Sequence, residues 1–181
     1  MTPNFLAIGH VVKDAIPGGF RLGGSVAYGA LTAVRMGLSA AIVTRAAENL
    51  DLTSELLGVQ IHCISSHETT IFENVDTSEG RRQYLRGQAD FITIGDLPLQ
   101  WLACPLVLLC PVAQELDQGL AQALYQSTVV VAPQGWLRGW REDGRVECLP
   151  WRGDNVLPHV QAAVLSQEEV AESSLLDYWK N

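Results

Sequence analysis

Residues 23–37, GGSVAYGALTAVRMG, contain the feature around which the rest of the chain is organised. The segment opens with two glycines, continues with small residues and closes on another glycine. Its apolar residues recur at i, i+3, i+4 and i+7, the spacing that places side chains on one face of an α-helix. They are Ala27, Ala30, Leu31 and Val34. The segment therefore predicts a glycine turn that leads into an amphipathic helix.

Local signals set the ends of this helix. Ser25 is the predicted N-cap, and Gly37 is the predicted C′ residue, after which residues 40–45 (AAIVTR) form a buried strand. Gly23 and Gly24 carry no Cβ, so a ligand can approach their backbone closely. A tight turn without a ligand would use the same residues. Neither GxGxxG nor GxxxxGK[ST] occurs, which disfavours the common nucleotide-binding loops.

The composition is that of a globular protein. The 181 residues are 48% hydrophobic and 18% charged, with a formal net charge of −8. Arg81, Arg82 and Arg86 form the only basic tract, so we expect no general binding to nucleic acid, which needs clustered cations. No apolar run of about 18 residues and no signal peptide is visible, which predicts a cytoplasmic protein with no membrane contact.

The cysteines and histidines show no metal-binding pattern. Cys63, Cys104, Cys110 and Cys148 form no CxxC pair, and no HExxH motif is present. We therefore expect free thiols rather than a zinc site or a disulfide framework.

The remaining segments alternate between strand and helix signals. We expect a strand over 5–12, a hairpin or flap over 13–22, and a short helix over 51–58. Three short strands over 60–65, 68–75 and 82–86 then predict a small meander, either a lid or an extension of the sheet edge. A strand–helix–strand unit follows, and after it a tryptophan-rich hairpin, a last strand and an acidic helix. These lie at 105–110, 114–125, 128–132, 136–151, 162–165 and from 166 onward.

This order of elements resembles the ribokinase-like carbohydrate kinases, the PfkB family. An early strand is followed by G-x-x-x-x-D, from Gly9 to Asp14, and the Gly-Gly turn of residues 23–37 leads into a helix that ends in Met-Gly. A small β lid follows, and a late strand leads to S-x-x-E, from Ser166 to Glu169, where the family has N-x-x-E. The resemblance implies a three-layer α/β/α domain with a mostly parallel sheet. Residues 1–181 would be a partial domain, with lid elements at about 13–22 and 60–86.

The resemblance also implies a substrate site. Asp14 is expected to accept hydrogen bonds from substrate hydroxyls, and Gly23 and Gly24 to let the sugar approach the backbone. Tyr28 stands where the family commonly has Asn, which implies a reshaped pocket and leaves the substrate open. The alternative for Asp14 is a solvated turn residue before Pro17.

On the phosphate and nucleotide side, the resemblance implicates Ser166 and Glu169. Glu169 is expected to help organise Mg²⁺ through water. The alternative is a favourable acidic charge in the first turn of a helix.

The implied activity is phosphoryl transfer, dependent on ATP and Mg²⁺, to a hydroxyl of a sugar or nucleoside-like molecule. The Gly-Ala-Gly-Asp segment, which supplies the catalytic base in the family, does not occur in the 181 residues. We therefore expect a truncated chain that carries mainly the substrate-binding half and does not phosphorylate efficiently by itself. Whether it acts as an enzyme stays open.

Two other functions stay open. The chain is alternatively a non-catalytic, polyol-binding or regulatory kinase-like module, in which case ligand binding would occur without turnover. A Rossmann-like dinucleotide enzyme is supported only by the predicted βαβ unit. A homodimer through the lid is expected by analogy with the family.

Overall fold

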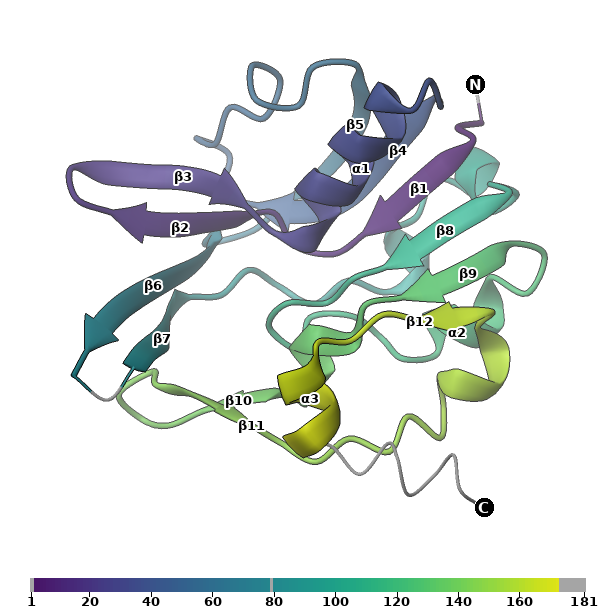
Figure 1. Ribbon diagram of the computed structural model, residues 1–181. Helices are drawn as coiled ribbons and strands as arrows, with labels where there is room; N and C mark the ends of the chain where they lie inside the picture. Colours follow the sequence, from purple (N-terminus) through teal and green to yellow (C-terminus); the bar gives the residue numbers. More distant parts are fainter. Residues whose placement is uncertain (1, 79, 173–181) are drawn as a thin grey trace.

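A six-stranded parallel sheet forms the centre of the computed structural model, which describes residues 2–78 and 80–172 (Figure 1). Its strand order is β12-β9-β8-β1-β4-β5. The strands are β1 (Phe5–Ile8), β4 (Ala40–Ala46), β5 (Val59–Ser65), β8 (Leu106–Leu109), β9 (Thr128–Val131) and β12 (Ala162–Ala163). The mostly parallel α/β sheet expected from the sequence is confirmed.

The sheet is covered on both faces, because successive side chains of a strand point to opposite sides. Phe5 and Ala7 of β1 pack into one core under α1 (Ser25–Arg35). Leu6 and Ile8 pack into the other core, which α2 (Leu120–Ala123) covers. Trp136 and Trp151 stack at 5.5 Å on this second side and are buried within that core.

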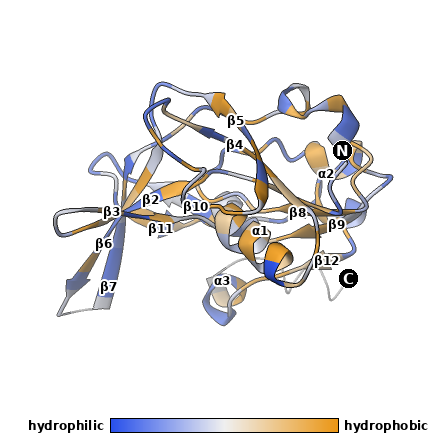
Figure 2. Cartoon of the chain, turned by 90° about the horizontal axis from the view of Figure 1, so that it is seen from above, coloured by the Kyte–Doolittle hydropathy of each residue, from blue (hydrophilic) through white to orange (hydrophobic). Residues whose placement is uncertain are grey.

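A smaller, four-stranded sheet projects from the central one (Figure 1). Its order is β3-β2-β6-β7, with β2 (Val12–Ile16) parallel to β6 (Thr70–Thr77) and the outer pairs antiparallel. The outer strands are β3 (Gly19–Gly23) and β7 (Gly80–Gly87). The β2–β3 hairpin confirms the hairpin expected over 13–22. Much of β7 is hydrophilic, in contrast to the apolar strands of the central sheet (Figure 2).

A separate hairpin docks on the edge of this smaller sheet. It consists of β10 (Arg138–Trp140) and β11 (Val146–Cys148) and confirms the hairpin expected over 136–151. The backbone N–H of Leu85 in β7 donates to the carbonyl of Gly144 at 2.8 Å. Tyr84 and Arg145 form an isolated antiparallel bridge beside it.

The predicted helix of residues 23–37 is confirmed, with one correction at its start. Ala27 and Ala30 are buried on the predicted face, and the N–H groups of Gly37 and Leu38 close the C-terminus on Val34 and Ala33. The N-cap, however, is Gly24 rather than Ser25, and no side chain caps the first turn. Ser25 is instead the first helical residue.

One predicted helix is absent and another is much shorter, because polar side chains there form hydrogen bonds with backbone groups that a helix would otherwise use. Residues 51–58 form turns, in which Asp51 accepts hydrogen bonds from the N–H and hydroxyl of Thr53 at 2.9 and 2.6 Å. Over 114–125, only α2 is helical. Gln114 has φ 59°, and the carboxylate of Glu115 binds backbone N–H groups of its own loop.

Two predicted strands are placed differently. The first strand ends at Ile8, and the N–H of Val11 then bonds to the hydroxyl of Thr44, so that Val12 begins a strand of the other sheet. The expected meander over 60–86 is wrong in its first strand, because β5 pairs in parallel with β4 along its whole length. Only β6 and β7 belong to the smaller sheet.

Among the described residues, no helix is long and apolar enough to cross a membrane. The acidic helix expected after residue 166 is present as α3 (Gln167–Glu172).

Candidate functional site

A cleft of about 470 Å³ lies between the smaller sheet, the start of α1 and the loops after the central strands. β1 has β4 on one side and β8 on the other, so the strand order reverses between β1 and β8. Ligands of open α/β sheets bind at the carboxyl ends of the strands at such a point. We call this cavity the first cleft. Its polar lining consists of Asp14, Ser25, Tyr28, Asn74, Arg81, Gln83, Gln134, Arg138 and Glu168.

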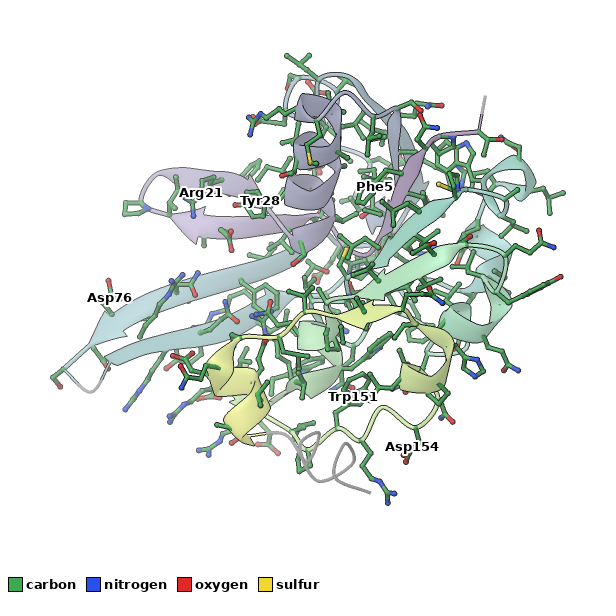
Figure 3. All side chains as sticks on the ribbon, turned by 45° about the vertical axis from the view of Figure 1, so that its right-hand side comes forward. Phe5, Arg21, Tyr28, Asp76, Trp151 and Asp154 are labelled. Atoms are coloured by element: carbon green, nitrogen blue, oxygen red, sulfur yellow. The ribbon has the colours of Figure 1, made fainter. Side chains whose placement is uncertain are left out.

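Asp14 and Tyr28 meet at Gly23. A Cβ on Gly23 would overlap Oδ2 of Asp14 and would lie 3.8 Å from the hydroxyl of Tyr28. The absence of a side chain at Gly23 thus makes room for the Asp14 carboxylate. Tyr28, which is 53% exposed, extends from the side of α1 that faces the β2–β3 hairpin (Figure 3). A carboxylate and a phenol therefore lie next to each other on one wall.

The start of α1 forms the adjoining wall. Gly24 has φ 93°, and a Cβ there would overlap the carbonyl oxygen of His10, so glycine is required on both grounds. Gly24 and Ser25 line the first cleft, and the first-turn N–H groups have no side-chain cap. The helix thus presents its electropositive end to the site.

The smaller sheet contributes amides. Asn74 of β6 and Gln83 of β7 are opposite each other in register, and Nε2 of Gln83 donates to Oδ1 of Asn74 at 3.0 Å. Phe72 lies two residues before Asn74 and therefore on the same face, where it also lines the first cleft. The two amide groups form a surface suited to hydroxyl groups, whereas the Phe72 ring is buried beneath the Arg138 guanidinium.

Arg138 supplies a positive charge at the base of the cleft. Its Nη1 donates to the carbonyl of Val112 at 3.0 Å, and its guanidinium lies 5.0 Å from the centre of the Phe72 ring. Burial lowers the pKa of Arg138, while the negative charges of Glu169, Glu115 and Asp14 act in the opposite direction.

Glu115 organises the loops beneath the site. It is 1% exposed, and its carboxylate accepts the N–H groups of Val112 at 3.0 and 2.9 Å, of Ala113 at 2.7 Å and of His10 at 2.9 Å. These N–H groups follow β8 and β1, the two strands at the reversal point. Glu115 thus ties the two loops together and sets the position of Val112.

His10 connects these loops to the smaller sheet. Its Nε2 lies 2.9 Å from the carbonyl oxygen of Asp90, and its Nδ1 lies 2.7 Å from the hydroxyl of Thr70, the first residue of β6. Because a carbonyl only accepts, Nε2 carries the proton and the Thr70 hydroxyl donates to Nδ1. Burial lowers the pKa of His10, which favours this neutral form.

Ser166 and Glu169 lie together at a second cleft of about 350 Å³, which adjoins the first. The N–H of Glu169 donates to Oγ of Ser166 at 3.2 Å, and the N–H of Ser166 donates to Oε2 of Glu169 at 2.7 Å. The pair is a capping box at the start of α3. Within residues 2–78 and 80–172, no three His, Cys, Asp or Glu side chains gather as a metal-binding cluster.

The residues expected to bind substrate thus meet at one place. Asp14, Gly24 and Tyr28 line the first cleft, whereas Gly23 lies behind Asp14 and is buried. Several lining residues were not predicted, chiefly Arg138, Gln134 and the pair Asn74–Gln83. The two-residue spacing of Phe72 and Asn74, which places both on one face of a strand, was visible in the sequence. No local pattern marked Arg138, which stands between tryptophans in a hairpin.

No protein-family model and no curated protein sequence matches the chain significantly. Solved structures do resemble it. A pyrophosphate-dependent kinase of the ribokinase family, complexed with a pyrophosphate analogue and myo-inositol, aligns with a TM-score of 0.79 and 23% identity. The alignment covers 97% of this chain and 66% of that one. A sulfate complex of a pyrophosphate-dependent kinase in the same family gives 0.79, 22% identity, and 97% and 67% coverage.

A nucleoside kinase of the ribokinase family from Methanocaldococcus jannaschii aligns with a TM-score of 0.60 and 12% identity, over 98% of this chain and 67% of that one. The chain therefore spans about two thirds of the length of the kinases it resembles. At these identities the likeness establishes the fold and not the activity. The chain has the ribokinase-like α/β fold.

Proposed function

We propose that the first cleft binds the hydroxyl-bearing acceptor of a ribokinase-type phosphoryl transfer. The convergence of Asp14, Tyr28, Asn74 and Gln83 on one cavity carries this proposal. A carboxylate accepts hydrogen bonds from hydroxyls, and the amides both donate and accept. Neighbouring hydroxyls of a sugar or cyclitol present such donors and acceptors side by side.

The substrate class is a small polyol, a sugar or a nucleoside. The cavity volume of about 470 Å³ lies in the range of small-molecule sites. One of the similar kinases was solved with myo-inositol, and another is a nucleoside kinase. Tyr28 occupies part of the wall and would restrict bulky substituents next to Asp14.

The residues of this chain would bind and orient the acceptor. Asp14 would hold the acceptor hydroxyls, and the smaller sheet would cover the acceptor and exclude water. The family's catalytic aspartate belongs to a Gly-Ala-Gly-Asp segment that these 181 residues do not contain, so the chain alone is proposed to bind without efficient turnover. A regulatory or sensing module would have the same cleft and would bind its polyol without consuming a phosphoryl donor.

The donor is proposed to be ATP with Mg²⁺ or, as in the two pyrophosphate-dependent kinases, pyrophosphate. Glu169 would act on Mg²⁺ through water, as the family resemblance implies, while its Oε2 accepts the N–H of Ser166. Mg²⁺ would supply positive charge to the donor phosphates. Dimerisation through the smaller sheet, and 1–181 as a single partial domain, stay predictions.

Titration calorimetry tests the proposal. Wild-type protein is titrated with myo-inositol, ribose and adenosine, and Asp14→Asn is compared with Asp154→Asn, a surface change at a residue paired with Arg152. At least one ligand should bind, and Asp14→Asn should weaken its binding about tenfold or more while Asp154→Asn leaves it unchanged. Equal binding by both variants would remove Asp14 from the site. Donor consumption by the native gene product then separates kinase from sensor.

A further inference from the structure

The first and second clefts share five lining residues, which are Arg81, Gln83, Gln134, Arg138 and Glu168. Four of them present hydrogen-bond donors, and the fifth, Glu168, is an exposed carboxylate at the start of α3. We propose that this junction is an oxyanion subsite that binds a phosphate group, with Arg138 as its fixed anchor and Arg81 as its second cation. The inference deepens the proposed function and rests on it for the identity of the neighbouring ligand.

Arg138 is held in place before any ligand binds. Nη1 donates to the carbonyl of Val112, the guanidinium stacks over Phe72, and Nε2 of Gln114 bonds to the backbone carbonyl of Arg138. Because Glu115 fixes Val112 through two hydrogen bonds, this arrangement is connected to the core. A guanidinium with a fixed orientation loses little conformational entropy when it binds an oxyanion, and it offers its remaining N–H groups in a planar fork.

The charge of Arg138 is not balanced by an ion pair. In the part of the chain that the structure describes, no carboxylate lies within ion-pairing distance of Arg138 or Arg81. The nearby carboxylates of Glu115 and Glu169 accept backbone N–H groups instead. Glu168, which lines both clefts, is exposed and, like the other described carboxylates, forms no ion pair with either arginine. A partly buried, unpaired cation carries a desolvation cost that a bound anion offsets.

Arg81 approaches the same junction from the smaller sheet. In the β6–β7 register it lies opposite Asp76, two residues from Gln83, so it shares the cleft-facing side of the sheet with Gln83. The strand that carries Arg81 is joined to the hairpin that carries Arg138 by the bond from Leu85 to Gly144. The two arginines therefore belong to connected elements on either side of one space.

The position relative to Asp14 gives the subsite its chemical meaning. Asp14 lines only the first cleft, whereas Ser166 and Glu169 line only the second, and the arginine junction lies where the two cavities adjoin. A phosphate bound there would lie between the polyol cleft and the donor side. Its source would be either a phosphoryl donor or a phosphate already attached to the acceptor.

Calorimetric titration with pyrophosphate, inorganic phosphate and myo-inositol 1-phosphate tests the subsite in wild type, Arg138→Gln and Arg81→Gln. Arg152→Gln is the matched control, because Arg152 is exposed and pairs with Asp154. At least one phosphate compound should bind, and each cleft variant should weaken it about tenfold, while the control binds as wild type. No binding by any of the three, or equal binding by both cleft variants, would overturn the proposal.

Thermal denaturation shows whether Arg138→Gln is folded. If it is not, Arg81→Gln decides, because the side chain of Arg81 makes no hydrogen bond or ion pair within residues 2–78 and 80–172. Pyrophosphate that binds to protein saturated with myo-inositol identifies a donor phosphate. Displacement of myo-inositol by its 1-phosphate identifies a phosphate on the acceptor. Either result supports the subsite. If a phosphate compound binds but no polyol does, the subsite stands and the proposed function is refuted. If a polyol binds but no phosphate compound does, the proposed function stands and the subsite is refuted.

Discussion

The carboxylate of Asp14 occupies the space that a side chain on Gly23 would need, so Asp14 can hold this position only if residue 23 is glycine. Gly23→Ala should displace Asp14 from the first cleft and weaken polyol binding about tenfold, although no charged group is removed. Calorimetry with the best polyol ligand measures this loss. Gly19→Ala is the matched control, because it lies in the same strand and its Cβ would meet nothing within 4 Å. If Gly23→Ala bound as well as the control, Asp14 would not be a ligand.

Glu115 should be among the residues on which stability depends most. Glu115→Gln replaces one carboxylate oxygen by an NH₂ group that faces backbone N–H donors, so at least one N–H loses its partner. We expect a loss of about 3 kcal/mol in the free energy of unfolding. Urea denaturation measures it. Glu142→Gln, on the exposed turn of the β10–β11 hairpin, should change stability by less than about 0.5 kcal/mol. A similarly small effect at Glu115 would show that its hydrogen bonds are dispensable.

The parts of the fold that follow periodic patterns were predictable from the sequence. The i, i+3, i+4, i+7 spacing from Ala27 to Val34 gave the helix its correct face, and the apolar runs became β4, β8 and β9. Hydrophobic periodicity indicates which face of a helix or strand is buried, and burial of apolar side chains is the main force that stabilises these segments.

The loops and most of the site could not be predicted in this way. Asp51 and Glu115 bind backbone N–H groups that a helix would otherwise use, and this competition leaves no periodic trace. Arg138 joins the site only because its hairpin docks against β7. Its contact with Phe72 links residues that are 66 positions apart in the sequence. Asp14, Gly24 and Tyr28 were expected because the resemblance to the ribokinase-like kinases rests on the continuous stretch of sequence that contains them.

His10 makes stability depend on pH. Its folded-state pKa lies below the ordinary value of 6.5, so between these two values the unfolded chain binds more protons than the folded one. Stability should therefore be complete above about pH 7 and fall as the pH drops through 6.5 toward the folded-state pKa. The free energy of unfolding from urea denaturation at pH 7.5 and 5.5 measures the difference.

The control for this titration is a pair of neutral substitutions. His10→Gln keeps an amide donor for the carbonyl of Asp90 and does not titrate, so its loss of stability between pH 7.5 and 5.5 should be smaller than that of wild type. His67→Gln, at an exposed position, should keep the wild-type difference. The same pH dependence in both variants would assign the effect to other groups, such as the carboxylates.

Alanine substitutions at two glycines test the contact between the β10–β11 hairpin and β7. Gly144 and Gly18 both have φ 84°, so alanine is strained by about 1 kcal/mol at either position. A Cβ on Gly18 would meet nothing within 4 Å, whereas a Cβ on Gly144 would overlap the carbonyl oxygen of Leu85. Gly144→Ala should therefore reduce the free energy of unfolding by about 1–3 kcal/mol more than Gly18→Ala does. It should also weaken phosphate binding, because the hairpin carries Arg138, while Gly18→Ala leaves that binding unchanged. Equal effects on stability would mean that the hairpin docks loosely on β7, and the two arginines would then lack a common support.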